Sequence, residues 1–209
     1  MAYDAYMHEN PEHLLIFAAG NDGDPEDQER TSCTINLPAI AKNVLAIGAT
    51  SSGATRWPLT SDDGDLISSY GVDDVADIGT VAYFSSYGLT RDGRIKPELV
   101  APGDQVLSAE SDGTEEQSCK VSALAGTSMS TPIVAGAAAM VRQYFRNYTF
   151  YAHDVNERGF CSNFTDVNAT NAFVCEEFSP AAATVKAMLV NSADLMGGSS
   201  EPDGWRGFG

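Results

Sequence analysis

The sequence predicts an α/β domain in which a mostly parallel sheet is covered by helices on both faces. Two continuous apolar runs, HLLIFAAG (13–20) and NVLAIGAT (43–50), are typical of strands buried on both sides. Two further apolar stretches, at residues 128–144 and 180–193, have the composition and the start signals of helices. Strands of this kind that alternate with helices indicate parallel pairing, because a parallel strand needs a crossover connection.

Length and charge narrow the class of protein. With 209 residues, the chain has the size of one domain that buries a substantial core. Its 29 Asp and Glu residues against 12 Lys and Arg residues give a formal net charge of −17, which argues against binding to nucleic acid or to an anionic membrane. No apolar run in the sequence has the length of a membrane span, and the opening residues lack the pattern of a signal peptide.

The first third of the chain is predicted to contain a helix, two strands and a polar surface segment. Residues 3–10 are expected to be the end of a helix that stops at Pro11. The strand over 13–20 ends at Gly-Asn-Asp-Gly, which is a turn signal. After the second strand, residues 51–79 become polar and acidic, so we expect an excursion on the surface.

Compact structure is expected again from residue 83 onwards. YFSSYG (83–88) is followed by IKPELVAPG (95–103), in which two prolines mark a loop and a short strand. QVLSA (105–109) and CKVSALAG (119–126) have the composition of an antiparallel pair around a polar loop.

The apolar helix over 128–144 begins with a serine. This helix has no charged residue before Arg142, so we expect it to be buried nearly all round. Pro132 is tolerated only in the first turn, which places the helix start at about residues 127–129. Ser128 therefore lies at the positive end of the helix dipole. The second helix, over 180–193, has proline at its start.

Cysteines and glycosylation sequences favour a secreted protein. The four cysteines lack the Cys-x-x-Cys spacing of a metal site, and they are either free and buried or paired, with Cys33–Cys119 and Cys161–Cys175 as the pairing that we favour among three. Asn-x-Ser/Thr sequences begin at Asn147, Asn163 and Asn168. We expect a disulfide-pinned insertion at about 151–178. Because no signal peptide precedes these features, we also expect the chain to be a fragment of a longer secreted product.

Several motifs, in this order along the chain, resemble those of the subtilisin-like serine peptidases, or subtilases. FAAGNDG (17–23) resembles their oxyanion-hole segment, and GTSMSTPIVAG (126–136) resembles their active-serine segment. LPAIAKNVLAIGAT, YFSSYG and KPELVAPG resemble landmarks between the two, and the closing GWRGFG resembles a Gly-x-Gly stretch near the end of the family domain. The resemblance implies a three-layer subtilisin-like fold, of which residues 1–209 form the C-terminal part of the catalytic domain.

The same resemblance implies a serine endopeptidase that acts on polypeptide substrates and requires no cofactor. Ser128 would be the nucleophile, and its N–H group with the side-chain amide of Asn21 would form the oxyanion hole. Asp22, at the rim of the pocket for the substrate side chain, would favour basic side chains. The small residues beside that pocket would be Ala18, Ala19 and Gly20.

The acid and base motifs of the family, Asp-Ser/Thr-Gly and His-Gly-Thr, do not occur in this sequence. None of the three histidines, His8, His13 and His153, has the glycine-rich context of the family's base. In the family both missing residues lie upstream of the asparagine, which agrees with a fragment. The alternative function is a catalytically dead binding or scaffold protein that keeps the fold.

Other ligand classes have weaker support. Two acidic clusters, Asp22-Asp24-Asp27 and Asp62-Asp63-Asp65, offer oxygen ligands for calcium, but neither completes a calcium-loop pattern, and solvated acidic loops are the favoured interpretation. Phosphate-binding loops of the Gly-x-x-x-x-Gly-Lys-Ser/Thr or Gly-x-Gly-x-x-Gly type are absent from the sequence, which disfavours a nucleotide-binding domain.

Overall fold

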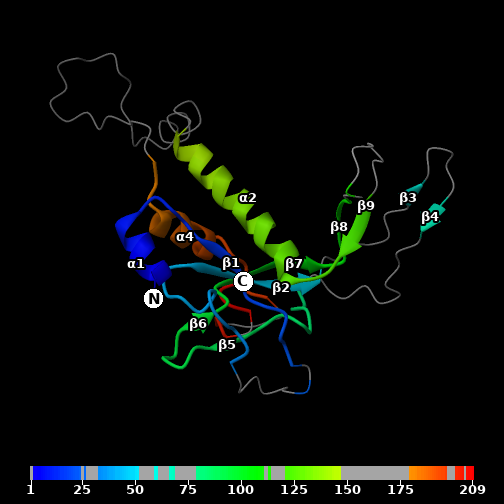
Figure 1. Ribbon diagram of the computed structural model, residues 1–209, viewed down its shortest axis with the longest axis horizontal. Coiled ribbons are helices and arrows are strands. Elements are labelled where there is room, and N and C mark those ends of the chain that lie inside the picture. The colour runs from blue at the N-terminus through cyan, green and yellow to red at the C-terminus, as the bar shows by residue number, and fades with distance from the viewer. Residues whose placement is uncertain are drawn as a thin grey trace, which may run out of the picture.

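A computed structural model gives the structure of the chain (Figure 1). It describes residues 2–24, 26, 33–51, 59–60, 66–68, 79–110, 113, 121–146, 179–196, 201–204 and 206–209. The helices are α1 (Ala2–Glu9), α2 (Thr127–Arg146) and α4 (Ala182–Asn191). The strands are β1 (Ile16–Ala18), β2 (Leu45–Ser51), β3 (Leu59–Thr60), β4 (Leu66–Ser68), β5 (Gly88–Leu89), β6 (Ile95–Lys96), β7 (Leu99–Asp104), β8 (Val106–Ala109) and β9 (Val121–Leu124).

The central sheet contains three parallel strands in the order β1-β2-β7. Ile16 of β1 lies opposite Leu45, and Ile47 lies opposite Leu99 of β7. The central strand β2 is buried along almost its whole length, as its uninterrupted apolar sequence predicts. The predicted α/β class with a parallel sheet is therefore confirmed.

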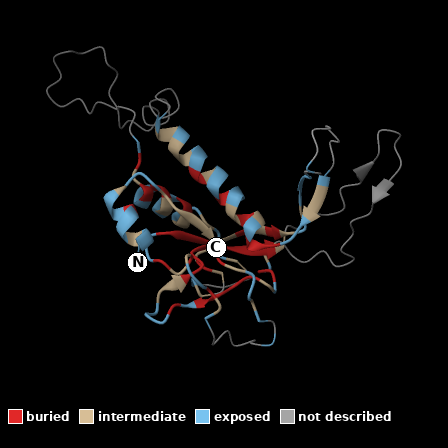
Figure 2. Cartoon of the chain, viewed as in Figure 1, coloured by how far each residue is buried: buried red, intermediate tan, exposed pale blue. Residues whose placement is uncertain are grey.

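Side chains of β2 alternate between two layers that cover the sheet. Leu45 and Ile47 pack with Val134 of α2 and Val185 of α4 on one face. Ala46 packs on the opposite face with residues of the segment that precedes β2, and Val44, just before the strand, contacts α1 there. Figure 2 shows the buried residues concentrated along this sheet and on the inner side of the helices.

The expected helices and the antiparallel pair are present. α1 ends at Glu9, just before Pro11, and α4 begins two residues after Pro180. β8 and β9 pair antiparallel with Val106 opposite Leu124, and they stand where α2 begins (Figure 1). Most of the acidic excursion at 51–79 and all of the expected insertion at 151–178 lie outside the described residues.

The expectation that α2 is buried nearly all round is wrong. Val134 and Ala138 face the core, whereas Ile133 is 45% exposed and Met140 is 65% exposed on the opposite side of the helix. β1 is likewise only half-buried rather than buried on both faces, because in the described structure it pairs with β2 alone and forms an edge of the sheet. In the described residues one side of α2 is left open, whereas β1 contacts both layers, with Ile16 on one face and Phe17 on the other, and is open along its unpaired edge.

No helix in the described part of the chain combines the length and the hydrophobicity needed to cross a membrane.

Close contact between β7 and the start of α2 depends on Gly103. A Cβ atom at this position would lie 2.1 Å from the Ser130 hydroxyl oxygen and 3.0 Å from the carbonyl oxygen of Gly126. We expect Gly103→Ala to lower the free energy of unfolding by about 1–3 kcal/mol through overpacking.

The matched control is Gly136→Ala in the exposed face of α2, where an added Cβ would contact nothing within 4 Å. It should raise the free energy of unfolding by about 0.8–1 kcal/mol, because alanine has the higher helix propensity. Urea unfolding followed by circular dichroism measures both changes. Equal stability of Gly103→Ala and the unmodified chain would contradict this description of the interface.

Candidate active site

Ser128 occupies the first turn of α2, at the end of the sheet where its strands terminate. The turn before the helix is fixed because the N–H group of Gly126 donates a 2.7 Å hydrogen bond to the carbonyl oxygen of Gly103, next to the end of β7. Gly126 has a φ angle of 151°, a conformation that favours glycine. Thr127 is fully buried and Ser128 is exposed, so the Ser128 residue is accessible to a ligand at the positive end of the helix.

Asn21 lies on the loop that follows the carboxyl end of β1. The preceding Gly20 has a φ angle of 115°, and its carbonyl oxygen accepts a 2.9 Å hydrogen bond from the N–H group of Ser86. The hydroxyl oxygen of Ser86 also accepts a 3.1 Å hydrogen bond from the N–H group of Asp22. Ser86 therefore holds the loop on both sides of Asn21.

Thr127 joins this loop to the start of α2. Its N–H group and its hydroxyl each donate a 2.9 Å hydrogen bond to the side-chain oxygen Oδ1 of Asn21. The same hydroxyl accepts a hydrogen bond from the N–H group of Gly20 at 3.3 Å. Asn21 and Ser128, which are 107 positions apart in sequence, are thus held next to each other.

The two bonds from Thr127 also decide which way the Asn21 amide points. An N–H donor needs an oxygen as its partner, so Oδ1 faces Thr127 and the Nδ2 group is directed away from that contact. A Cβ atom on Gly126 would lie 3.4 Å from Nδ2, which places this amide nitrogen against the turn just before Ser128. The Asn21 amide is therefore an oriented donor at the helix start.

This geometry can stabilise developing negative charge next to a hydroxyl. The Asn21 Nδ2 group supplies N–H donors. In the first turn of α2 the N–H groups of Thr127 and Met129 are already bonded to Asn21 and to the carbonyl oxygen of Gly126, so the N–H group of Ser128, between them, is the helix-start donor beside the Ser128 side chain. Donors fixed before a reaction stabilise an oxyanion more effectively than donors that must reorient. An exposed serine beside such donors is the arrangement that acyl transfer requires.

The predicted pocket residues lie near Asn21 in different environments. Ala18 and Gly20 are half-buried, and Asp22 is exposed. Ala19 is 3% exposed and packs in the core with Ile35, Ala39 and Ala46, so its side chain is closed to solvent.

The described histidines lie far along the sheet from Ser128. His8 is in the last turn of α1, and His13 precedes β1, whereas Asn21 follows the opposite end of that strand. His13 is engaged with Tyr6, whose hydroxyl lies 2.6 Å from Nδ1. His153 falls outside the described residues.

The structure describes few of the residues that the sequence offers as metal ligands or disulfide partners. Within the described ranges, no group of three or more His, Cys, Asp or Glu side chains is arranged to hold a metal ion. The residues of the acidic clusters that lie outside these ranges are Asp27, Asp62, Asp63 and Asp65. Cys33 is an exposed free thiol, which disagrees with the favoured Cys33–Cys119 bridge. The other cysteines and the glycosylation sequences also lie outside the described residues.

Sequence reasoning missed Thr127 and Ser86 as residues that build this site. Thr127 directly precedes Ser128 in the Gly-Thr-Ser motif. This position in the motif was the only feature of the sequence that pointed to a role for Thr127 in the site. Ser86 belongs to the YFSSYG landmark, which the sequence placed in compact structure without indicating its contact with the Asn21 loop.

Fold and site together define an α/β domain that presents a helix-start serine and an oriented amide at the carboxyl ends of parallel strands. A family model described as the Subtilase family matches residues 1–209. The chain belongs to the subtilase family.

Similarities to known proteases support this family assignment. The serine protease AprX of Bacillus subtilis is 36% identical over 138 residues, which are 62% of this chain and 26% of AprX. The solved structure of the prenylagaramide maturation protease PagA is 25% identical, with a TM-score of 0.52 over 99% of this chain and 50% of PagA. A lanthipeptide protease shares the fold, with 20% identity and a TM-score of 0.57 over 98% of this chain and 50% of its own. The chain thus spans about half the length of these solved structures.

Ser130 is a buried polar residue beneath the site whose hydroxyl has no hydrogen-bond partner in the described part of the chain. A buried hydroxyl without a partner destabilises the folded state, since it has lost its hydrogen bonds to water. We expect Ser130→Ala to raise the free energy of unfolding by about 1–2 kcal/mol, measured by urea denaturation.

Ser85→Ala is the matched control, because Ser85 is equally buried but its hydroxyl oxygen accepts a 3.0 Å hydrogen bond from the N–H group of Ala49. Its removal should lower the free energy of unfolding by about 1–3 kcal/mol, since the Ala49 amide loses its partner. Destabilisation of both variants by the same amount would show that Ser130 is satisfied in solution.

Proposed function

We propose that this chain supplies the nucleophile and the oxyanion hole of a serine endopeptidase. Ser128 attacks the carbonyl carbon of a peptide bond, the amine leaves with a proton, and water then hydrolyses the acyl-enzyme. Family membership supports the reaction class. The exposure of Ser128 at a helix start supports its assignment as the nucleophile.

The observation that carries the proposal is the pair of 2.9 Å hydrogen bonds from Thr127 to the Oδ1 atom of Asn21. These bonds leave the Asn21 Nδ2 group to face the negative oxygen of the tetrahedral intermediate. The N–H group of Ser128 would be the second donor to that oxygen. Electrostatic stabilisation of this kind contributes a large part of the rate in acyl transfer.

A general base and its orienting acid must come from outside the described residues. The open edge of β1 and the exposed Ile133 and Met140 on α2 are surfaces against which a further part of the same domain would pack. We therefore expect the active enzyme to be a longer, secreted product in which that part carries Asp-Ser/Thr-Gly and His-Gly-Thr sequences. In the complete enzyme, half-buried Ala18 and Gly20 would border the substrate pocket, with Asp22 at its rim.

Labelling with a fluorophosphonate probe tests the assignment of Ser128. A serine without a general base is a weak nucleophile, and serine peptidases stripped of triad members keep only about 10³–10⁴-fold catalysis over water. We expect the 209-residue chain alone to remain unlabelled, and the longer product to be labelled in a manner that Ser128→Ala abolishes. Mass spectrometry of the labelled peptide measures the site.

Two outcomes would contradict this account. Robust labelling of the isolated chain would mean that a base is already present in it. A longer product that contains both sequences and still fails to react, while remaining folded, would favour a binding or scaffold protein that keeps the subtilase fold.

Kinetics of the longer product test the role of Thr127. Removal of the oxyanion-hole asparagine in subtilisin costs roughly 10²–10³ in kcat, and Asn21→Leu should lose a similar amount. Thr127→Val removes one of the two bonds to Asn21 and should lower kcat by about tenfold, the equivalent of one hydrogen bond, with little change in KM.

Thr127→Ser is the matched control, because serine keeps the hydroxyl and the N–H group that contact Asn21. It should retain most of kcat. If Thr127→Val and Thr127→Ser lose the same activity, the threonine acts through its methyl group and packing rather than through the amide of Asn21.

A further inference from the structure

A recess lies at the end of the sheet opposite to Ser128. It has a volume of about 810 Å³ and is lined by α1, the segment before β2, the β5–β6 hairpin and α4. Ser128 and Asn21 lie at the carboxyl ends of the strands, whereas Lys42 and Asn43 of this recess immediately precede β2. We refer to it as the amino-end cavity. Its volume is that of a site for a small molecule or a short peptide segment.

Basic residues are concentrated around the amino-end cavity in an otherwise acidic protein. Only 12 Lys and Arg residues occur in the chain, and four of them line this one recess. Among the described residues, one carboxylate, that of Glu98, lines it. The four basic residues are Lys42, Arg94, Lys96 and Lys186.

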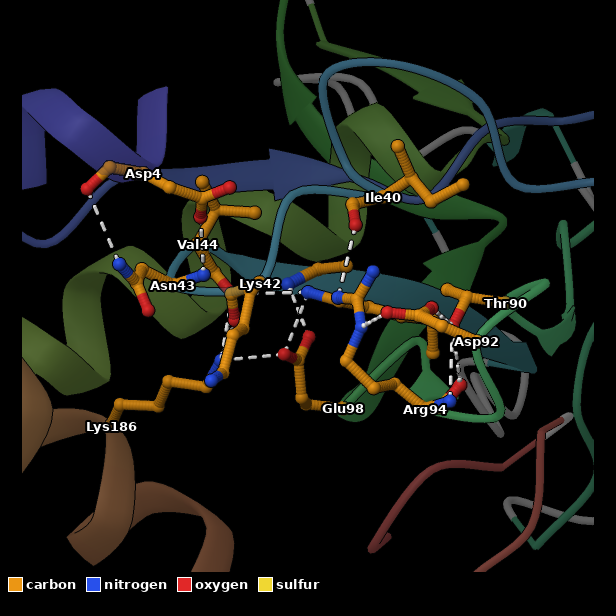
Figure 3. A network of polar contacts seen from close by, with 12 residues as sticks. Asp4, Ile40, Lys42, Asn43, Val44, Thr90, Asp92, Arg94, Glu98 and Lys186 are labelled. Carbon is orange, nitrogen blue, oxygen red and sulfur yellow. Dashed lines mark hydrogen bonds and ion pairs between the residues drawn. The ribbon is translucent and has the colours of Figure 1, made fainter. Parts of the chain in front are cut away.

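The Glu98 carboxylate does not neutralise this charge (Figure 3). Its Oε1 atom contacts the ammonium groups of both Lys96, at 2.7 Å, and Lys186, at 2.5 Å. Its Oε2 atom accepts a 2.8 Å hydrogen bond from the N–H group of Ala46. Two cations thus share one anion, which leaves the cluster with one positive charge in excess.

Further positive charge borders the same cluster. Arg94 is partly neutralised by Asp92, at 2.8 Å, and donates to the carbonyl oxygen of Ile40. Lys42 is exposed and lies at the rim. The adjoining amino end of α4 has neither a capping side chain nor an acidic residue in its first turn, and its first N–H group, that of Ala182, donates to the neutral carbonyl oxygen of Pro11, so no anion offsets the helix dipole there in the described residues.

The environment of the buried Lys96 side chain agrees with a shortage of negative charge in the Lys96–Glu98–Lys186 cluster. Its side chain is 1% exposed. Desolvation lowers the pKa of Lys96 to about 8, although the Glu98 carboxylate acts to raise it, and Lys186 adds repulsion. An additional anion beside the cluster would stabilise the protonated amine.

Apart from His8, Asn43 and Gly93, the remaining wall of the amino-end cavity is apolar. It is formed by Met7, Pro11, Ile95, Val190 and Phe208 together with alanines of α4. A ligand that fits both parts of the wall carries one negative charge and an apolar chain.

We propose that the amino-end cavity binds an apolar carboxylate, a ligand whose carboxylate faces Lys42, Arg94 and Lys186 and whose apolar tail lies between α1 and α4. One negative charge matches the single excess charge of the Lys96–Glu98–Lys186 cluster. This binding involves no residue of the Ser128 site and does not depend on the proposed peptidase activity.

Isothermal titration calorimetry with the 209-residue chain tests the proposal, with octanoate as the probe. Octylamine has the same tail and the opposite charge, and acetate has the same charge without the tail. We expect octanoate to bind at least about tenfold more tightly than either, because a desolvated charge contact and a buried tail both contribute. Octylamine that binds as well as octanoate, or octanoate that does not bind at millimolar concentration, would overturn the proposal.

A charge-matched pair of variants locates the site. Lys42→Gln removes a rim cation whose side chain is exposed, and it should weaken octanoate binding by about threefold to tenfold. Arg91→Gln removes a cation that is also exposed and is close to Arg94 in sequence but does not line the cavity, and it should leave binding unchanged. Equal effects of the two variants would overturn the proposed location.

Binding measurements with two peptides identify which kind of molecule supplies the carboxylate. A tripeptide that ends in leucine is compared with the same peptide carrying a C-terminal amide. Tighter binding of the free acid than of octanoate indicates that the cavity captures peptide C-termini, and the reverse order indicates a free fatty carboxylate. If the acid and the amide bind equally and octanoate does not bind, the cavity does not select a carboxylate.

Discussion

One small contact organises the carboxyl end of the sheet: the two hydrogen bonds from Thr127 to the side-chain oxygen of Asn21. They connect the loop after β1 to the first turn of α2. Thr127 is fully buried and Asn21 is exposed, so the contact anchors a surface loop to a buried residue. The bonds fix Ser128 and the Asn21 amide relative to each other and at the same time determine which end of that amide is available to a ligand.

The parallel arrangement of β1, β2 and β7 gives the two ends of the sheet different chemistry. Strand carboxyl ends lead into loops that present Asn21 and the start of α2. The amino ends are approached by Lys42, the β5–β6 hairpin and α4, which together concentrate positive charge around Glu98. In a chain with a net charge of −17, this local reversal of charge requires the fold, because the four basic residues come from three separate segments.

Much of the architecture was predictable because it follows from local patterns. The buried strand β2, the start of α2 near Thr127 and the β8–β9 pair all follow from apolar runs, from proline at a helix start and from turn signals. Exposure was not predictable in the same way. The apolar sequence of α2 shows that a face is suited to burial, but only coordinates show that the side with Ile133 and Met140 is left open in the described residues.

The sequence by itself determined the fold class, the family resemblance and the identity of Ser128 and Asn21 as candidate residues, since motif order and periodicity are properties of the chain. Tertiary structure decided the orientation of the Asn21 amide, the contact of Ser86 with its loop, the burial of the Ser130 hydroxyl without a hydrogen-bond partner among the described residues, and the charge of the amino-end cavity. Each of these depends on atoms that are distant in sequence and within a few ångströms in space. Hydrogen bonding and electrostatic energy depend on that distance, and a linear pattern does not contain it.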